Sequence, residues 1–235
     1  MLISPSIFSA EVISKTQENP KDVRLILNDP TSSFHFTPGQ YITLKVSEHI
    51  YRSYSICSNA DDLPNFSLLI ESAHKGVGAD YINSLKVTDH VTFIGPSGKL
   101  VLPEKFPSDL YFFATGTGIA PFMSMFYQLQ KLNFPGNVTL FLGIRKENEI
   151  VFEKELDSFS QNLKNFKHFL HVSRPDDTNI TPSRVTSVVN NMIDTNALYF
   201  LCGHPLMIEE IETGLIRNGI STQNIFKEGF TRSNK

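Results

Sequence analysis

Residues 110–132 read LYFFATGTGIAPFMSMFYQLQKL, and this stretch decides the fold of the second half of the chain. Residues 110–115 form an apolar run that is typical of a buried strand, and residues 118–132 repeat apolar residues at helical spacing. Between them, Gly116 and Gly118 permit a sharp turn and a close approach of the backbone, and Pro121 suits the first turn of a helix. This order predicts a parallel α/β sheet whose helix N-terminus offers N–H groups to a phosphate.

The segments that follow repeat this alternation of strand and helix. Apolar strand candidates occupy 138–144, 168–173 and 197–203. Each is followed by a segment that we expect to be helical (151–163, 184–193 and 205–219), and a last strand candidate occupies 225–230. Strands that alternate with helices form a parallel sheet covered on both faces. The second half is therefore predicted to be a doubly wound parallel α/β sheet.

The first hundred residues have a different rhythm. Short strand candidates occupy 23–28, 41–46, 66–72 and 90–95, and turn-forming residues separate them. One segment, 79–86, has helical spacing instead. Several short strands at this spacing predict an antiparallel β-barrel or a sandwich. A proline-containing connector at 102–109 follows, so the expected domains are residues 1–105 and residues 106–235.

Composition excludes several classes of protein. The chain has 235 residues, of which 40% are hydrophobic and 19% charged, an ordinary globular balance. Its net charge of −3 argues against a nucleic-acid-binding protein that relies on bulk electrostatics. Its two cysteines, Cys57 and Cys202, are too few for a disulfide framework, a four-cysteine metal site or an iron–sulfur cluster. No apolar run approaches the roughly 20 residues that span a bilayer, and the N-terminus lacks the features of a signal peptide, so we expect a soluble cytoplasmic protein.

Candidate nucleotide-binding residues follow the strands of the second half, because doubly wound sheets bind ligands at those carboxyl ends. The first turn reads GxGxxP rather than the fingerprint GxGxxG, and by itself it fits a turn without a ligand equally well. Arginines and a serine then stand where an NAD site usually has an acidic residue, and fork-shaped donors suit a 2′-phosphate. Each arginine alone is better interpreted as a surface residue, but the group favours NADP(H) over NAD(H). The candidates are Gly116, Thr117, Gly118, Gly143, Arg145, Ser173, Arg174, Arg184, Cys202 and Gly203.

Cys202 ends the fourth of these strands, before Gly203 and a proline that suits a helix start. A small apolar side chain at such a place belongs by default to the core. A lone cysteine without a base partner is weak evidence for a nucleophile. We expect Cys202 to pack beside a bound ring.

In the first half, RSYS (52–55) puts a cation, an aromatic ring and a hydroxyl close together. On a strand, Arg52 and Tyr54 point to one face and Ser55 to the other. Taken alone, the pattern fits an exposed arginine beside a tyrosine that packs in the barrel.

Five segments together resemble the ferredoxin–NADP reductase family, including its bacterial flavodoxin and ferredoxin reductases. They are RSYS (52–55), GTGIAPF (116–122), SR (173–174) with Arg184, CGHP (202–205) and KEGF (227–230). The resemblance covers essentially the whole chain in the family's order and spacing, although no one motif decides it. It implies an FAD-binding antiparallel barrel followed by an NADP(H)-binding α/β domain.

The resemblance also implies roles for barrel residues. Arg52 would pair with the FAD pyrophosphate, Tyr54 would stack on the isoalloxazine, and Ser55 would hydrogen-bond near flavin N5. The turn at 75–82 would meet the pyrophosphate through helix N–H groups, with Ala79 in place of the family's usual serine or threonine and Asp80 facing water. The implied FAD contacts are Arg52, Ser53, Tyr54, Ser55, Leu69, Ile70, Glu71, Gly76, Val77, Gly78, Ala79, Thr117 and Phe230.

The C-terminal KEGF matches a family pattern of a glutamate, one residue, and an aromatic that covers the flavin. Phe230 would have to move when the nicotinamide arrives. Ser55, Cys202 and Glu228 would line the hydride-transfer site as catalytic residues. Without the resemblance, Glu228 fits a surface glutamate and Phe230 a core residue.

The implied function is that of an FAD-dependent oxidoreductase, acting as a monomer without a metal. It would transfer hydride between NADPH and FAD, and single electrons to or from ferredoxin or flavodoxin. One alternative is a flavin reductase that uses FAD or FMN as a diffusing substrate, although such enzymes tend to carry Phe at the position of Tyr54. Others are the reductase component of an oxygenase system with a separate iron–sulfur protein, and an interaction subunit with a vestigial site.

Overall fold

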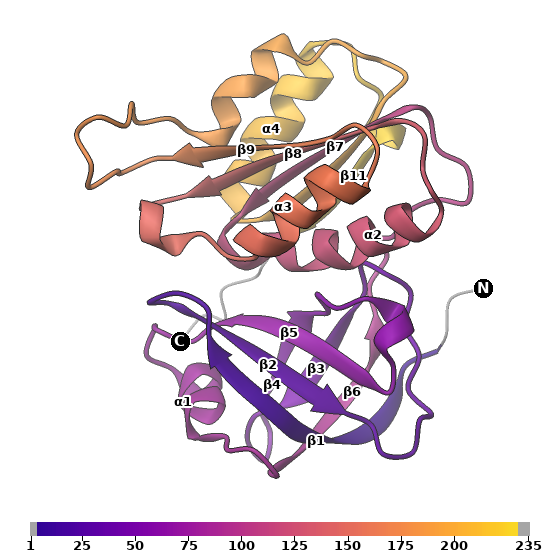
Figure 1. The fold of residues 1–235 in the computed structure, drawn as a ribbon, viewed down its shortest axis with the longest axis vertical. Coiled ribbons are helices and arrows are strands. Elements are labelled where there is room, and N and C mark those ends of the chain that lie inside the picture. The colour runs from indigo at the N-terminus through magenta and orange to yellow at the C-terminus, as the bar shows by residue number, and fades with distance from the viewer. Residues whose placement is uncertain (1–3, 230–235) are drawn as a thin grey trace. The chain divides into compact units, whose positions relative to one another are not determined.

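The computed structural model describes residues 4–229 of the chain (Figure 1). The chain divides into two compact units. The barrel unit comprises Met1–Leu102 with Ala120–Gln128, and the α/β unit comprises Pro103–Ile119 with Leu129–Lys235. A segment beyond the expected boundary at residue 105 is thus grouped with the barrel unit, and the boundary itself stays a prediction.

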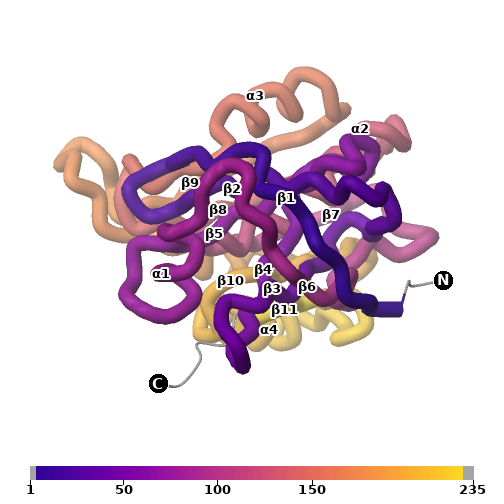
Figure 2. The backbone as a smooth tube through the Cα atoms, turned by 90° about the horizontal axis from the view of Figure 1, so that it is seen from below, coloured from indigo at the N-terminus to yellow at the C-terminus, as the bar shows by residue number. Residues whose placement is uncertain are grey.

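The barrel unit is built on a six-stranded antiparallel sheet with the strand order β4-β3-β6-β1-β2-β5. A 3₁₀ helix and one α-helix interrupt the strands, and α1 lies outside the sheet in both views (Figures 1 and 2). The elements are β1 (Ser6–Gln17), β2 (Asp22–Asn28), β3 (Tyr41–Lys45), β4 (Tyr51–Ser55), η1 (Ala60–Asp62), β5 (Asn65–Glu71), α1 (Val77–Ser84) and β6 (His90–Ser97).

The sheet curls so that its two edge strands approach each other. A β-bridge joins Ile56, the residue after β4, to Leu68 of β5. Phe34, Phe66 and Phe93 fill the core on the concave side, with ring centroids 4.9 to 5.5 Å apart. The predicted antiparallel barrel architecture is confirmed, as a curled sheet with one apolar face.

The sequence predictions left out β1, a strand of 12 residues that lies between β6 and β2 in the sheet. Its pairing with β2 shifts register between Val12 and Ser14, so Ile13 is an extra residue in the ladder. Such a bulge breaks the alternation by which a strand is recognised from its sequence. The helix expected near 79–86 is confirmed as α1.

The α/β unit is built on a five-stranded parallel sheet with the order β11-β10-β7-β8-β9. The helices α3 and α4 lie on opposite faces of this sheet (Figure 1). The elements are β7 (Asp109–Thr115), η2 (Gly116–Ile119), α2 (Ala120–Lys131), β8 (Asn137–Ile144), η3 (Glu147–Glu149), α3 (Glu153–Asn162), β9 (Phe166–Val172), η4 (Val185–Asn191), β10 (Leu198–Gly203), α4 (Pro205–Arg217), η5 (Thr222–Asn224) and β11 (Ile225–Gly229). Apart from the partly shared α2, these elements belong to the α/β unit.

The strand order confirms the predicted doubly wound sheet. β7, the first strand of the unit, lies between β8 and β10, so the direction in which strands are added reverses between β7 and β10. A doubly wound sheet binds its ligand at this switch point, beyond the carboxyl ends of the strands. The carboxyl ends of β7 and β10 therefore frame the place where a ligand is expected.

One predicted helix has a different form. Residues 184–193 contain the 3₁₀ helix η4 rather than an α-helix. The segment RVTSVVNNMI is rich in β-branched residues and asparagine, which have low α-helix propensity. Val185 and Val189 are nevertheless buried against the sheet, so the segment still covers one face. Among residues 4–229, no helix is long and apolar enough to cross a membrane.

Candidate functional site

The edge strand β4 presents Arg52 and Tyr54 on one face. They lie opposite Leu44 and Ile42 of β3, which are fully buried, so both side chains point to the apolar side of the curled sheet. Both are half-buried, and Ser55, on the other face, is buried. Burial raises the pKa of Tyr54 to about 12, although the nearby Arg52 charge lowers it. The tyrosine is therefore a neutral ring with a hydroxyl at physiological pH.

The glycine-rich turn before α1 packs against these two side chains. A Cβ on Gly78 would lie 3.1 Å from Tyr54 Oη and 3.2 Å from Arg52 Cγ, so only glycine fits here without a shift. Gly76 has φ +153°, and no atom of residues 4–229 lies within 4 Å of its Cβ position, so among these residues the turn is open on its other side. The turn and RSYS, which are separate in sequence, thus form one surface.

The N-terminus of α1 keeps free N–H donors. Gly76 occupies the N-cap position, no side chain of the described part of the chain caps the helix, and the Asp80 N–H is bonded to Gly76 O at 2.9 Å. The N–H groups of Val77, Gly78 and Ala79 precede the first intrahelical bond and are available to an anion. Asp80 is exposed, as expected.

The backbone of Leu69 and Glu71 faces the open edge of β5. Ser67 O accepts from Cys57 N across this edge, whereas Ser72 N donates to Lys21 O on the β2 side. Because backbone groups alternate between the two edges of a strand, Leu69 and Glu71 share the direction of Ser67. Ile70 points its backbone toward β2, so two of the three residues predicted at 69–71 offer backbone groups to a ligand.

These features of the barrel unit fit a dinucleotide with an aromatic ring system. Arg52 donates from Nη1 to Tyr51 O at 2.8 Å and forms no ion pair with a carboxylate of residues 4–229. Its charge, the N–H groups of α1 and the packed ring of Tyr54 lie on one surface. Ser53, by contrast, is exposed and pairs with Thr43 at 3.0 Å between their hydroxyls, on the face away from Arg52 and Tyr54.

In the α/β unit, two glycine turns interlock at the switch point. A Cβ on Gly118 would overlap Cys202 O and come to 2.8 Å from Gly203 Cα. A Cβ on Gly203, which has φ +136°, would overlap Thr115 Oγ1 and come to 2.9 Å from Thr115 N. Backbone therefore packs directly on backbone between the ends of β7 and β10.

Gly116 is the open member of this group. Its φ is +54°, a left-handed conformation that favours glycine, and no described residue has an atom within 4 Å of its Cβ position. Gly143, at the end of β8, is closed instead, because its Cβ would lie 3.1 Å from Thr115 Cγ2 and from Val185 Cγ1. Thr117, between the two glycines of the first turn, is half-buried.

The predicted arginines stand at the ends of β8 and β9. Arg174 N donates to Arg145 O at 2.8 Å, so the two backbones run side by side. Ser183 N donates to Val172 O at 2.8 Å, which returns the chain, and Arg184 after it, to the end of β9. Ser173 Oγ donates to Ile144 O at 3.2 Å and helps fix this edge.

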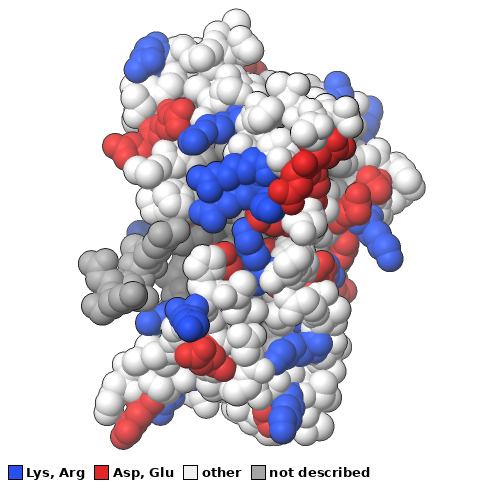
Figure 3. All heavy atoms as spheres, turned by 90° about the vertical axis from the view of Figure 1, so that its left-hand side faces the viewer, with Lys and Arg blue, Asp and Glu red and all other residues white. Residues whose placement is uncertain are grey.

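All three guanidinium groups are exposed, and none forms an ion pair within residues 4–229. Carboxylates do lie close by in the chain, but other donors engage them. Asp176 pairs with Lys146 at 2.9 Å, and Glu147 accepts the N–H groups of Asp176 and Asp177, each at 3.1 Å. On the face shown in Figure 3, basic and acidic side chains accordingly lie next to each other in the upper part.

Cys202 and Glu228 are neighbours on adjacent strands. They are register partners on β10 and β11, so their side chains lie on the same face of the sheet. Burial, together with the Glu228 charge, raises the pKa of the Cys202 thiol well above its usual value, so the thiol is neutral. Burial also raises the pKa of Glu228 to about 7. Phe230, the remaining residue of the predicted group, lies outside the described residues.

The sequence predictions missed Thr115 and His204. Thr115 Oγ1 accepts from His204 N at 2.9 Å, which ties the end of β7 to the turn after β10. His204 caps α4, because its Nδ1 accepts from Leu206 N at 3.2 Å. The sequence did contain a signal for each of them: Thr115 is a hydroxyl residue just before a glycine turn, and His204 is a histidine just before a proline that opens a helix.

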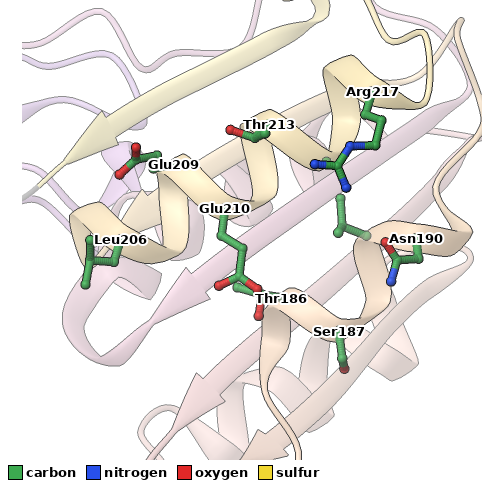
Figure 4. A pocket seen from close by; sticks show the side chains of 10 residues that line it. Thr186, Ser187, Asn190, Leu206, Glu209, Glu210, Thr213 and Arg217 are labelled. Carbon is green, nitrogen blue, oxygen red and sulfur yellow. The ribbon is translucent and has the colours of Figure 1, made fainter.

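A cavity of about 530 Å³ lies between η4 and α4 (Figure 4). On α4 its lining residues Leu206, Glu210, Thr213 and Arg217 recur at helical spacing. The segment η4 contributes Thr186, Ser187, Val189 and Asn190. None of the predicted site residues lines this cavity, so the predicted nucleotide site is a different part of the unit.

Comparison with known proteins assigns a type to each half. Residues 8–102 match the family model of the oxidoreductase FAD-binding domain, and residues 112–213 match that of the oxidoreductase NAD-binding domain. The two models cover most of the chain and leave residues 103–111 between them.

Three individual proteins illustrate the similarity. The toluate 1,2-dioxygenase electron transfer component of Pseudomonas putida is 30% identical over 84% of this chain, which spans 60% of that protein's length. Ferredoxin–NADP reductase B of Sorangium cellulosum is 26% identical over 67% of this chain and 72% of its own. The structure of ferredoxin–NADP⁺ reductase from Plasmodium falciparum with 2′P-AMP has the same fold, with a TM-score of 0.81 at 21% identity over 96% of this chain and 97% of its own.

Proposed function

Because the chain belongs to the ferredoxin reductase-type family of FAD- and NAD-binding oxidoreductases, we propose that it is a ferredoxin or flavodoxin reductase that uses NADPH. In this function it transfers hydride between NADPH and FAD, and single electrons to or from ferredoxin or flavodoxin. The chemistry that FAD would supply when bound is to link hydride transfer, which moves two electrons, to the transfer of single electrons. The residues of the chain bind, orient and shield the reacting groups.

In the barrel unit, Arg52 and the first turn of α1 bind the FAD pyrophosphate. Within residues 4–229, the guanidinium of Arg52 has no ion-pair partner and the first N–H groups of α1 are free, and together on one surface they provide charge-assisted hydrogen bonds to a diphosphate. Tyr54 stacks on the isoalloxazine through its neutral ring. Ser55 donates or accepts a hydrogen bond near flavin N5, and the backbone of 69–71 supplies further contacts.

In the α/β unit, the turn 116–118 and Gly203 let the NADP(H) backbone approach the sheet, and Gly143 leaves room for Thr115 and Val185 at the end of β8. Ser173, Arg174 and Arg184 bind the 2′-phosphate, with Arg145 adding charge. The observation that carries the choice of NADP(H) is that three exposed arginines at two neighbouring strand ends have no ion-pair partner within residues 4–229. The oxygens of a 2′-phosphate would accept hydrogen bonds from these guanidinium groups.

Cys202 and Glu228 act at the nicotinamide end. The neutral, buried thiol of Cys202 supplies an apolar contact for a ring rather than a nucleophile. Glu228, with a pKa of about 7, can hold or release a proton near neutral pH. Phe230 is proposed to cover the flavin and to move away for the nicotinamide.

The NADP(H) assignment is tested by substituting Arg174→Ala and Arg184→Ala together. Loss of one to two charge-assisted hydrogen bonds, each worth about 1.5 to 3 kcal/mol, raises the KM for NADPH by at least about tenfold. The KM for NADH stays within about twofold, because NADH has no 2′-phosphate. Arg217→Ala, an exposed arginine on α4, is the matched control and leaves both constants unchanged. Equal effects of the double substitution on NADPH and NADH refute the phosphate assignment.

A second candidate acceptor follows from the relatives. The similarity to a dioxygenase electron transfer component supports a reductase that serves an oxygenase through a separate iron–sulfur protein. Stopped-flow reduction of a ferredoxin, a flavodoxin and an oxygenase iron–sulfur protein, each at equal concentration, ranks the three acceptors.

A flavin reductase, in contrast, would lose its yellow colour on desalting. The domain boundary at residue 105, a monomeric state and a cytoplasmic location stay predictions.

A further inference from the structure

Lys15 reaches from β1 to the C-terminal end of α1. Its Nζ donates to Ile82 O at 3.0 Å, to Asn83 O at 2.7 Å and to Leu85 O at 2.9 Å. The last carbonyl groups of a helix have no intrahelical partners, and an ammonium group has three N–H donors. One side chain thus donates to three carbonyls, of which Ile82 O also accepts from Leu85 N at 3.3 Å, and it places a positive charge at the negative end of the helix dipole.

The bulge in β1 is what brings Lys15 to this place. Before the bulge, Ala10 and Val12 are fully buried on the apolar face. Ile13 is the extra residue and is 38% exposed, and after it Lys15 pairs with the fully buried Leu25. Without the extra residue, the alternation of the strand would turn Lys15 to the opposite face. The bulge therefore re-aims a lysine onto the same side of the sheet as α1.

The other end of α1 carries the proposed FAD contacts. Gly78, in the first turn, packs against Arg52 and Tyr54, and the free N–H groups of residues 77–79 lie beside it. A helix of eight residues is about 12 Å long and is not stable by itself in water. Its orientation thus depends on a few tertiary contacts. Besides the packing of Gly78, these include the burial of Ile82, the bond from Asn83 Nδ2 to Ser72 O at 3.0 Å, and Lys15.

We propose that Lys15 is a positioning residue for FAD, an inference that rests on the proposed function of the barrel unit. By binding the C-terminal carbonyls of α1, Lys15 fixes the direction in which the N-terminal N–H groups point toward the pyrophosphate. It acts through the helix and touches no part of the cofactor. The barrel thereby orders its anion site before the cofactor binds, which lowers the entropy lost on binding.

The test compares Lys15→Met with Lys15→Arg in apoprotein prepared without FAD. Methionine keeps an apolar stem but removes all three donors, whereas arginine keeps charge and donors. FAD affinity is measured by quenching of flavin fluorescence. We expect Lys15→Met to raise the Kd for FAD about tenfold, and Lys15→Arg to keep it within about threefold of the wild-type value. Lys45→Ala, an exposed lysine on β3, is the control and leaves the Kd unchanged.

Hydrogen exchange of the apoprotein supplies a readout that does not need FAD. Amides of α1 exchange faster in Lys15→Met than in wild type, while those of β2 and β6 keep their protection. Affinity for 2′-phospho-AMP, which measures the α/β unit, stays the same. If Lys15→Met does not fold, Lys15→Gln, which retains a donor amide, is measured in the same way and decides the question.

Two results overturn the proposal. Unchanged exchange in α1 would show that Lys15 does not order the helix. Faster exchange in α1 with an unchanged Kd for FAD would show that Lys15 is structural only. Failure of the proposed function is recognised separately, because the wild-type apoprotein would then not bind FAD at all.

Discussion

Two glycine turns with the same spacing, Gly76–Gly78 in the barrel unit and Gly116–Gly118 in the α/β unit, differ in what holds them. In both, the first glycine has a positive φ and open space where a Cβ would stand. In both, the second glycine is closely packed. Around Gly78 the neighbours are the side chains of Tyr54 and Arg52, whereas around Gly118 they are the backbone atoms of residues 202 and 203.

The difference follows from the two sheets. Parallel strands end at one edge, so the turns after β7 and β10 meet main chain to main chain, and the sheet fixes both. The turn before α1 joins no neighbouring strand and rests on side chains, which can move by a few tenths of an ångström. The α/β turn is expected to tolerate change poorly, and the barrel turn to be adjustable.

The largest expected effect is that of Gly118→Ala. The new methyl group would overlap Cys202 O, a backbone atom that cannot move without separating β7 from β10. Overpacking of this kind costs about 3 kcal/mol, and binding of 2′-phospho-AMP is lost with it. Hydrogen exchange of β7 and β10 measures the stability of the unit. Gly116→Ala is the control: it adds strain in the left-handed conformation without a steric contact and costs about 1 kcal/mol. Equal losses of stability in the two variants would contradict the role assigned to backbone packing around Gly118.

The two units also differ in their response to pH. In the α/β unit, burial raises the pKa of Glu228 from 4.5 to about 7. A raised carboxyl pKa penalises the charged form, so the contribution of Glu228 to stability is fully present below pH 4.5 and is lost as pH rises to about 7. Because the side chain is partly exposed, we expect a loss of about 1 to 2 kcal/mol. Glu228→Gln removes this dependence, as measured by hydrogen exchange of β10 and β11 between pH 4.5 and 8.

The barrel unit provides the opposite case in Asp29. Burial raises the pKa of its carboxyl, but hydrogen bonds from the Thr31 hydroxyl and from the N–H groups of Phe34, Thr31 and Ser33 outweigh burial, and the pKa is lowered. A lowered pKa stabilises the fold above pH 3.8, and this contribution is lost as pH falls through the folded pKa. Acid therefore removes the contribution of Asp29 to the barrel unit, and neutral pH removes the contribution of Glu228 to the α/β unit. An equal pH dependence of hydrogen exchange in β10 and β11 for the wild type and Glu228→Gln would contradict this contrast.

Gly78→Ala has a smaller expected effect. Its methyl group would lie 3.1 Å from Tyr54 Oη and 3.2 Å from Arg52 Cγ, so the two side chains must shift slightly. We expect the Kd for FAD to rise about tenfold, while the barrel loses less than about 1 kcal/mol of stability. Flavin fluorescence measures the first and chemical denaturation the second. Gly76→Ala separates strain from contact, because its Cβ would meet nothing within 4 Å.

The smallest expected effect is a gain. The α/β turn carries a hydroxyl at Thr117, whereas Ala79 in the barrel turn has none. Ala79→Ser adds a donor at the helix N-terminus, worth about 0.5 to 1.5 kcal/mol, and should lower the Kd for FAD about threefold. Ala79→Val adds volume without a donor and is expected not to tighten binding. Equal effects of serine and valine would show that the gain comes from packing.

Sequence reasoning predicted the α/β unit better than the barrel unit. Gly116, Arg145, Arg174 and Cys202 were assigned to the carboxyl edge of one sheet, and each indeed ends or follows a parallel strand there. In the barrel unit, the bulge at Ile13 hid β1 from the pattern. The contact of Gly78 with Tyr54 could not be predicted, because it depends on how far the sheet curls.

By itself, the sequence determined the two kinds of sheet and the residues at the ends of the parallel strands. It could do so because the spacing of hydrophobic residues and the positions of glycines are local properties. Only the tertiary structure decided which backbone Gly118 meets, that the three arginines have no ion-pair partner within residues 4–229, and that Lys15 holds α1. Lys15 lies 67 to 70 residues from the carbonyls that it binds. Such contacts depend on register, on a bulge and on curvature, which no local pattern records.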